Sequence, residues 1–194
     1  MHKIKSMSTG YQIKDQEALY YLTFQVVDRV DIFTRQEYRD IVIGSFKYAM
    51  KEKDFQLFAY VIMSNHVHLI ANSSVGELSN TIRDIKKYTS NRIIEAIQTI
   101  HESRRDWLLN RFKFKASQHS RNKSYQLWKH ENHAIYLYSL DFIAEKVDYI
   151  HNNPVQAGIV MNPKDYYYSS ARNYASLEAP MDVFVLSLPW KTYV

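Results

Sequence analysis

The sequence has no cysteine and little glycine or proline, with four of each among its 194 residues. The absence of cysteine excludes disulfide scaffolds, structural zinc held by thiolates and a cysteine nucleophile, and it fits a reducing cytoplasm. The four glycines, Gly10, Gly44, Gly76 and Gly158, lie far apart in the chain. Neither a GxxxxGK loop nor a GxGxxG fingerprint can be built from them, so we expect no nucleotide cofactor.

Long hydrophobic runs are also missing. No apolar stretch approaches the roughly 18 residues that a membrane-spanning helix needs. The first residues, MHKIKSMSTGYQIK, lack the apolar segment of a secretory signal. We therefore expect a cytoplasmic protein with no membrane contact.

Aromatic and basic residues are abundant by contrast. The chain has 16 tyrosines, nine phenylalanines and three tryptophans, and its formal net charge is +5 with a pI of about 9.2. A basic, tyrosine-rich chain suits a polyanionic partner, although many ordinary domains carry a similar charge. The length predicts one domain with a sizeable hydrophobic core.

The first half of the chain alternates strand and helix patterns. Residues 18–30 mix aromatic, β-branched and polar residues in the manner of a strand. A helix capped by Thr34 follows and ends near residue 53. Two further strands, 55–63 and 66–72, are separated by a short turn, which predicts an antiparallel hairpin.

The second half contains two further helices by its periodicity. Apolar residues at helical spacing predict a long helix over 77–100. Residues 101–124 are basic and without a period, and we expect them to be irregular. A short strand is expected within 125–138, and a last helix opens after Ser139 and stops at Pro154.

This order of elements predicts an α+β fold with a ferredoxin-like antiparallel sheet and helices on one face. We expect three parts of the chain: an N-terminal arm at 1–17, the main domain at 18–162 and a C-terminal extension at 163–194. No internal repeat or low-complexity linker separates them.

His66 and His68 are the first candidate site. They flank Val67 at the start of a predicted strand. Residues i and i+2 of a strand project from the same face, about 7 Å apart, so two imidazoles could converge on one metal ion. The alternative is a pair of half-exposed histidines satisfied by ordinary hydrogen bonds.

Tyr149 and Asn153 form the second candidate. They are i and i+4 on the last helix, and therefore neighbours on one face. An amide oxygen could bind a metal ion beside a phenol that attacks a substrate. The alternative is that Tyr149 packs in the core and that Asn153 only ends the helix before Pro154.

The basic residues cluster after residue 83, and five aromatic residues are interleaved with them between 107 and 128. Positive charge can follow a phosphate backbone while aromatic rings stack on unpaired bases. The alternative is a solvated surface above core aromatics. The candidate nucleic-acid-binding residues are Lys86, Lys87, Arg92, Arg104, Arg105, Arg111, Lys113 and Lys115.

Four segments carry a family resemblance. YVIMSNHVHLIA, at 60–71, resembles the His-hydrophobe-His motif of the HUH single-tyrosine transposases. VDYIHNNPVQAGIV at 147–160 and DYYYSSARNY at 165–174 resemble the C-terminal signature of the REP-associated tyrosine transposases, and LWKHENHAIYL at 127–137 resembles the segment that precedes it. The similarity extends over about residues 18–175, with the motifs in the same order and separation.

The resemblance implies a ferredoxin-like HUH fold with the histidine pair on a central strand. It implies that His66, His68 and Asn153 are metal ligands, in a mixed nitrogen and oxygen site suited to Mg²⁺ or Mn²⁺. It also implies that Tyr149 is the nucleophile.

The activity implied is metal-dependent nicking and strand transfer of single-stranded or hairpin DNA through a 5′-phosphotyrosine intermediate. The basic residues are then expected to contact the hairpin backbone. The resemblance is compatible with a monomer or a homodimer. Two alternatives are a non-catalytic hairpin DNA- or RNA-binding protein on the same fold and a metal-dependent hydrolase that uses a water nucleophile.

Overall fold

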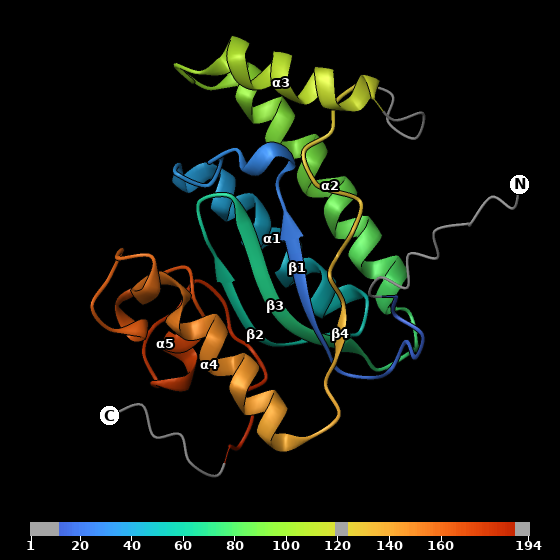
Figure 1. The fold of residues 1–194 in the computed structure, drawn as a ribbon, viewed down its shortest axis with the longest axis vertical. Coiled ribbons are helices and arrows are strands. Elements are labelled where there is room, and N and C mark those ends of the chain that lie inside the picture. The colour runs from blue at the N-terminus through green and yellow to red at the C-terminus, as the bar shows by residue number, and fades with distance from the viewer. Residues whose placement is uncertain (1–11, 119–123, 189–194) are drawn as a thin grey trace, which may run out of the picture.

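The computed structural model describes residues 12–118 and 124–188, and its centre is a four-stranded sheet (Figure 1). The strand order is β2-β3-β1-β4, and every neighbouring pair is antiparallel. The strands are β1 (Tyr20–Gln25), β2 (Phe55–Ile62), β3 (His66–Ser73) and the two-residue β4 (Ile135–Tyr136). With α1 (Gln36–Glu52) and α2 (Leu78–Thr99) between them, the elements follow the predicted ferredoxin-like order, which is confirmed.

The two faces of the sheet are covered by different helices. Helices α1 and α2 lie over one face, and α4 (Leu140–Gln156) lies over the other (Figure 1). Because side chains alternate along a strand, Leu22 and Phe24 of β1 join the larger core under α1 and α2, whereas Tyr21 joins a smaller cluster with Val147 of α4. The sequence predicts helices on one face of the sheet, and α1 and α2 do lie together on one face. The layer formed by α4 on the other face was not predicted.

Several predicted boundaries are wrong by a few residues. Strand β1 covers only six of the residues 18–30, because a 3-10 turn at Val27–Arg29 interrupts it. Helix α1 has Arg35 rather than Thr34 at its N-cap, and no side chain caps it. The Thr34 hydroxyl instead accepts a hydrogen bond from the Arg104 guanidinium.

Residues 105–117 form a helix where an irregular segment was expected. This helix, α3 (Arg105–Ser117), lies beyond the end of the sheet (Figure 1). It buries only Leu108, Phe112 and Ala116, which recur every four residues. The buried stripe of this helix is only one residue wide, and its neighbours are basic and polar. Such a narrow stripe gives no clear helical period of hydrophobic residues in the sequence.

The last helix begins as predicted and ends later than predicted. The Ser139 hydroxyl accepts a hydrogen bond from the backbone N–H of Phe142, as expected of an N-cap. Pro154 does not stop α4, which continues to Gln156. Because proline has no backbone N–H, the helix loses one hydrogen bond at this position. The proline ring is buried near the end of the helix, and its packing compensates for that loss.

Residues after 163 pack against the free edge of β2. The backbone N–H of Ile62 donates to Tyr168, that of Ser170 donates to Tyr60, and that of Phe184 donates to Leu57. A short helix, α5 (Ala171–Tyr174), lies in this segment. The segment therefore covers an edge that would otherwise expose unpaired backbone groups. Among the helices of the described residues, none combines the length and the apolar character that a membrane crossing requires.

Candidate active site

His66 and His68 lie on central strand β3, on the face of the sheet that α4 covers. Register explains this placement, because His68 pairs with Thr23 of β1, whose neighbours Leu22 and Phe24 face the opposite core. The two imidazole centroids are 4.6 Å apart. Burial lowers the pKa of His66 and lowers that of His68 to about 3, so both rings are neutral near pH 7. Neutral imidazole is the form that binds a metal ion.

The Nδ1 atom of His66 is held by Asn65. The Asn65 Oδ1 lies 2.8 Å from that nitrogen, and the Asn65 Nδ2 donates to Asp31 Oδ1 at 2.9 Å. Because the amide nitrogen is used by the carboxylate, the amide oxygen faces the ring and accepts the Nδ1 proton. This chain of hydrogen bonds places the ring proton on Nδ1, so Nε2 is the nitrogen of His66 that could bind a metal ion.

The Nδ1 atom of His68 is held by two hydroxyls of β1. Tyr21 Oη lies 2.7 Å from it and Thr23 Oγ1 lies 2.9 Å from it. Tyr21 and Thr23 are i and i+2 on their strand, so both side chains reach the same face. As in His66, the hydrogen-bonding partners lie at Nδ1, on the side of the ring away from Nε2.

Helix α4 brings Tyr149 and Asn153 to the histidine pair. The Tyr149 ring centroid lies 5.4 Å from that of His68, and Asn153 forms a side-chain hydrogen bond with His66. The Tyr149 side chain is 41% exposed, which leaves it accessible to a substrate. All four candidate residues therefore meet in one place, on two elements of a single chain.

The donor set fits a divalent cation. Two imidazole nitrogens and one amide oxygen make a mixed nitrogen and oxygen site, which suits Mg²⁺ or Mn²⁺. Within residues 12–118 and 124–188, no group of three or more histidines or carboxylates forms another candidate.

Lys146 places a positive charge beside the tyrosine. Its Nζ lies 6.0 Å from the centre of the Tyr149 ring and 5.0 Å from that of Phe142, and it forms an ion pair with Glu145. Lys146 and Tyr149 are i and i+3 on α4, so they share a face. The ammonium group therefore adds positive charge beside Tyr149, where it would attract a phosphate group.

Sequence reasoning missed the residues that surround the four candidates. Lys146 could have been found from its helical spacing to Tyr149, and Asn65 from its position next to His66. Tyr21 and Thr23 had no such signal, because only the register of β1 against β3 brings them to His68.

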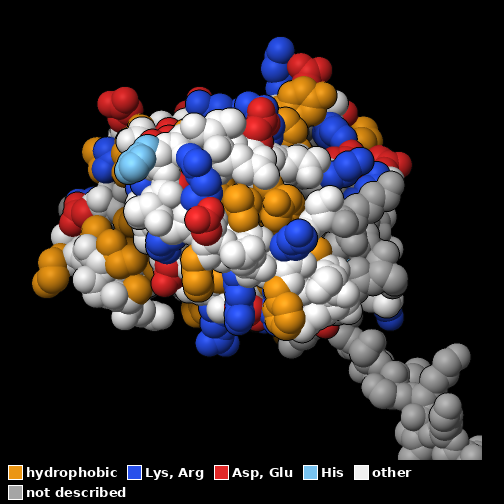
Figure 2. Space-filling view, turned by 90° about the horizontal axis from the view of Figure 1, so that it is seen from above, with side chains coloured by type: hydrophobic (Ala, Val, Ile, Leu, Met, Phe, Trp, Pro, Cys, Tyr) orange, Lys and Arg blue, Asp and Glu red, His pale blue; other side chains and the backbone are white. Residues whose placement is uncertain are grey.

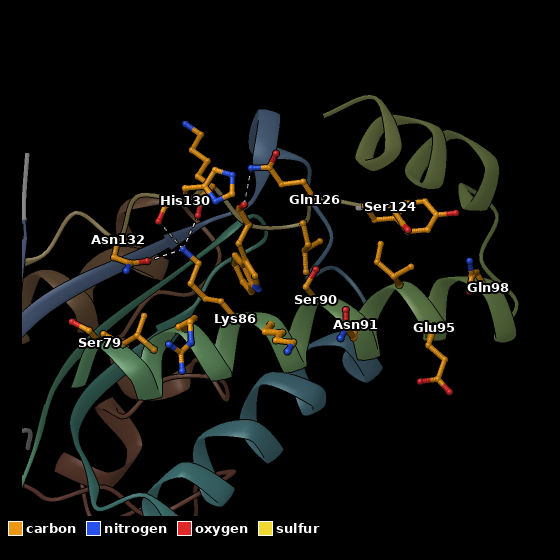
Figure 3. Close-up of a pocket in the computed structure, with 18 residues that line it drawn as sticks. Ser79, Lys86, Ser90, Asn91, Glu95, Gln98, Ser124, Gln126, His130 and Asn132 are labelled. Carbon is orange, nitrogen blue, oxygen red and sulfur yellow. Dashed lines mark hydrogen bonds between the residues drawn. The ribbon is translucent and has the colours of Figure 1, made fainter. Parts of the chain in front are cut away.

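A groove between α2 and residues 124–132 contains two of the predicted nucleic-acid-binding lysines (Figure 3). Its volume is about 960 Å³. Lys86 Nζ donates across it to the carbonyl of Lys129 and to Asn132 Oδ1, both at 2.6 Å, and burial lowers the pKa of Lys86 to about 8. Lys86 thus holds the two walls of the groove together, whereas Lys87 is exposed.

This groove is connected to the active site through β1. Its outer wall pairs with β1, since the backbone N–H of Thr23 donates to Asn132 and that of Lys129 donates to Gln25. The side chain of the same Thr23 contacts His68. The groove and the histidine pair therefore lie on opposite sides of one strand.

Most of the other predicted basic residues have acidic or carbonyl partners. Arg92 pairs with Glu95, and Arg105 donates to two carbonyls at the end of α2. The remaining ion pairs are Arg104 with Glu102, and Arg111 and Lys115 with Asp28. The end of the molecule where α3 lies accordingly shows basic side chains mixed with acidic and apolar ones (Figure 2).

Lys87 and Lys113 differ from these residues. Both are exposed, and within the described parts of the chain neither has an ion pair or hydrogen bond through its side chain. They are the two predicted contacts whose ammonium groups are not used by the fold.

Comparison with known proteins identifies the family. Residues 15–123 match the family model described as "Transposase IS200 like", a range that contains His66 and His68 and ends before Tyr149. No curated protein matches the chain. Among solved structures, a REP-associated tyrosine transposase bound to a REP hairpin is similar in fold, with 18% identity, a TM-score of 0.59 and coverage of 95% of this chain and 98% of that one. Since the family model spans more than half of the sequence, the chain belongs to the family of IS200-like transposases.

Proposed function

We propose that this protein is a transposase that nicks single-stranded DNA beside a hairpin and transfers the strand through Tyr149. Membership of the IS200-like transposases supports the transposase role. The observation that carries the proposal is the position of Tyr149, whose half-exposed ring lies 5.4 Å from that of His68. A tyrosine that only packed in the core would not need to lie exposed beside one buried and one half-buried histidine, both neutral.

The reaction begins with attack of the Tyr149 Oη atom on a phosphodiester phosphorus. The Oη–P bond forms and the P–O3′ bond breaks, so the electron pair leaves with the 3′ oxygen, which takes up a proton from water. The product is a 5′-phosphotyrosine and a free 3′-hydroxyl. A 3′-hydroxyl from the same or another strand can reverse the attack, so the phosphodiester energy is conserved and no nucleotide is consumed.

The residues around Tyr149 have separate tasks in this scheme. His66, His68 and Asn153 would hold a divalent cation, which when bound supplies charge stabilisation for the phosphate oxygens. Asn65 keeps the His66 ring in the binding tautomer. The Lys146 ammonium would attract the incoming phosphate.

Hairpin DNA is the proposed substrate because the structurally similar transposase was solved with a REP hairpin. On this chain we assign backbone contact first to Lys87 and Lys113, whose charges are exposed and unshared. The other predicted residues keep their structural partners and can still add to the positive electrostatic potential around the DNA. They are Lys86, Arg92, Arg104, Arg105, Arg111 and Lys115.

The decisive experiment is covalent trapping. The protein is incubated with hairpin DNA that carries a single-stranded flank labelled on the 3′ side of the nick, with Mn²⁺, and a denaturation-resistant adduct is sought. We expect the adduct with the wild type and with Tyr167→Phe, a control of similar exposure, and we expect none with Tyr149→Phe. An adduct that survives Tyr149→Phe would exclude Tyr149 as the nucleophile.

A non-catalytic hairpin-binding protein is the second candidate function. It would bind hairpins with the same lysines and would form no adduct with any of them. Cleavage without an adduct would instead indicate a water nucleophile.

A further inference from the structure

Tyr21 has an unusual set of partners for a buried tyrosine. Its hydroxyl lies 2.7 Å from His68 Nδ1, and it also forms a side-chain hydrogen bond with Tyr149. Only 7% of the residue is exposed, and its ring stacks on His68 and meets the Tyr149 ring edge-on. One phenol therefore bridges a candidate metal ligand and the candidate nucleophile.

The single proton of the Tyr21 hydroxyl restricts the hydrogen bonds that it can donate. A phenol has one proton to donate, and it can accept hydrogen bonds at the same time. If Tyr21 donated its proton to His68 Nδ1, the ring would carry its own proton on Nε2, and that nitrogen could not bind a metal ion. If His68 instead carries the proton on Nδ1, Tyr21 accepts there, and the Tyr21 proton is free for Tyr149 Oη.

Thr23 favours the second arrangement. Its Oγ1 lies 2.9 Å from the same His68 nitrogen and it hydrogen-bonds Tyr21, so it can accept from His68 and donate to Tyr21. The direction of every hydrogen bond is then consistent, from His68 through Tyr21 to Tyr149. The tautomer that leaves Nε2 free for a metal ion is also the one that turns the Tyr21 proton toward the nucleophile.

We propose that Tyr21 is a further catalytic residue, which donates a hydrogen bond to Tyr149 Oη. Because Tyr21 can do so only when His68 carries its proton on Nδ1, the tautomer of His68 that can bind a metal ion is also the one in which Tyr149 receives this hydrogen bond. The inference rests on the proposed function of Tyr149. When Tyr149 loses its proton to solvent and attacks, Tyr21 keeps its own proton and stabilises the anionic oxygen by a hydrogen bond alone. In the reverse reaction it stabilises the same oxygen as it leaves phosphorus.

The test is the Tyr21→Phe variant, which keeps the ring and removes only the hydroxyl. At saturating hairpin DNA and Mn²⁺ we expect the single-turnover rate of adduct formation to fall about 10- to 100-fold. Hairpin affinity and melting temperature should stay close to those of the wild type. The matched control is Tyr38→Phe, which removes another buried phenol, hydrogen-bonded to Glu102 on the opposite face of the sheet, and should leave the rate unchanged.

A second readout needs neither DNA nor a metal ion. Ring ¹⁵N spectra of the metal-free protein should show His68 mainly as the Nδ1–H tautomer, with a shift toward Nε2–H in a Tyr21→Phe, Thr23→Val double variant. A merely structural tyrosine would not change this tautomer ratio.

The outcomes separate the two proposals. If the wild type forms the adduct and Tyr21→Phe forms it at the same rate, the role of Tyr21 is overturned and the proposed function stands. If His68 is mainly Nε2–H in the metal-free wild type, the direction of the hydrogen-bond chain is overturned. If the wild type forms no adduct at all, the proposed function fails, and the tautomer spectra still decide whether Tyr21 and Thr23 orient His68.

Discussion

The two faces of the central strands differ in chemistry although they share a backbone. On the face under α1 and α2, β1 and β3 present Leu22, Phe24, Val67 and Leu69, all buried in one apolar core. On the face under α4, the intervening positions of the same strands carry hydroxyls and imidazoles that hydrogen-bond one another, as Tyr21 does with His68. The first face stabilises the strands, and the second uses their rigidity to hold reactive groups. The comparison predicts that substitutions on the two faces fail in different ways.

The largest expected effect on the polar face is that of His68→Ala. Removing one imidazole should lower the rate of adduct formation by about 100- to 1000-fold, because a ligand for the charge-stabilising cation is lost. The unfolding midpoint should also fall, because the side chain is buried and the Tyr21 and Thr23 hydroxyls lose their partner, so the rate is compared per folded molecule. Single-turnover trapping and urea unfolding on the same preparation measure both quantities. A variant that keeps its rate would contradict the ligand role.

The next largest effect is expected on the apolar face, where a substitution should lower stability and leave the adduct rate almost unchanged. Leu69→Ala, one residue away on β3, should lower the free energy of unfolding by about 2–5 kcal/mol through lost burial and a residual cavity. Its adduct rate per folded molecule should remain near that of the wild type. If Leu69→Ala instead abolished trapping while the chain stayed folded, the division between the two faces would be wrong.

Asn65→Ala tests whether the hydrogen bond to His66 on the polar face supports metal binding. Without the amide oxygen the His66 ring loses its orienting partner, and affinity for Mn²⁺ should fall about 10- to 100-fold. Titration of the protein with Mn²⁺, followed by electron paramagnetic resonance, measures this directly. The matched control is Asn91→Ala on α2, which should leave the affinity unchanged.

Acid should destabilise the fold through a buried histidine of the α4 layer. Burial lowers the pKa of His151 from its usual 6.5 to about 3, so between these values the unfolded chain binds a proton that the folded chain does not. Stability is therefore fully present above about pH 6.5 and is lost as pH falls toward 3, by about 2 kcal/mol between pH 7 and pH 5. Urea unfolding at both pH values tests this. His151→Gln should reduce the dependence by the His151 share and leave the share of His66 and His68, whose pKa values burial also lowers.

The smallest effects concern the exposed lysines. Lys87→Ala and Lys113→Ala should each weaken hairpin binding a few-fold and reduce the slope of log affinity against log salt by about 1. Lys51→Ala on α1, an exposed lysine paired with Glu52, serves as the control. Equal salt slopes for all three variants and the wild type would remove Lys87 and Lys113 from the DNA contact.

Local spacing predicted the strands and each of the two candidate pairs, whereas the meeting of the two pairs was expected only from the family resemblance. The period of two in β3 placed His66 and His68 on one face, and the helical period joined Tyr149 to Asn153. The contact of α4 with β3 brings the two pairs together, and the predicted ferredoxin-like order, with helices on one face only, did not include it.

The remaining features depended on tertiary packing, which the sequence pattern does not report. Pro154 was read as a helix stop, but burial of its ring at the end of α4 outweighs one lost hydrogen bond. Lys86 is predicted from the sequence to contact the nucleic acid, yet its ammonium group joins α2 to residues 129–132. Helix α3 was missed because its buried stripe is one residue wide.

The hydrogen bond between His151 and Ser170 has a consequence for the order in which the protein matures during synthesis. The imidazole lies two residues after Tyr149, and the Ser170 hydroxyl that it contacts at 2.8 Å is itself fixed to the backbone of Tyr60. Helix α4 is thus fastened to the sheet by residues that leave the ribosome after it. A nascent chain that already contains the histidine pair and Tyr149 therefore lacks one of the hydrogen bonds that hold α4 in place until residue 170 has also left the ribosome.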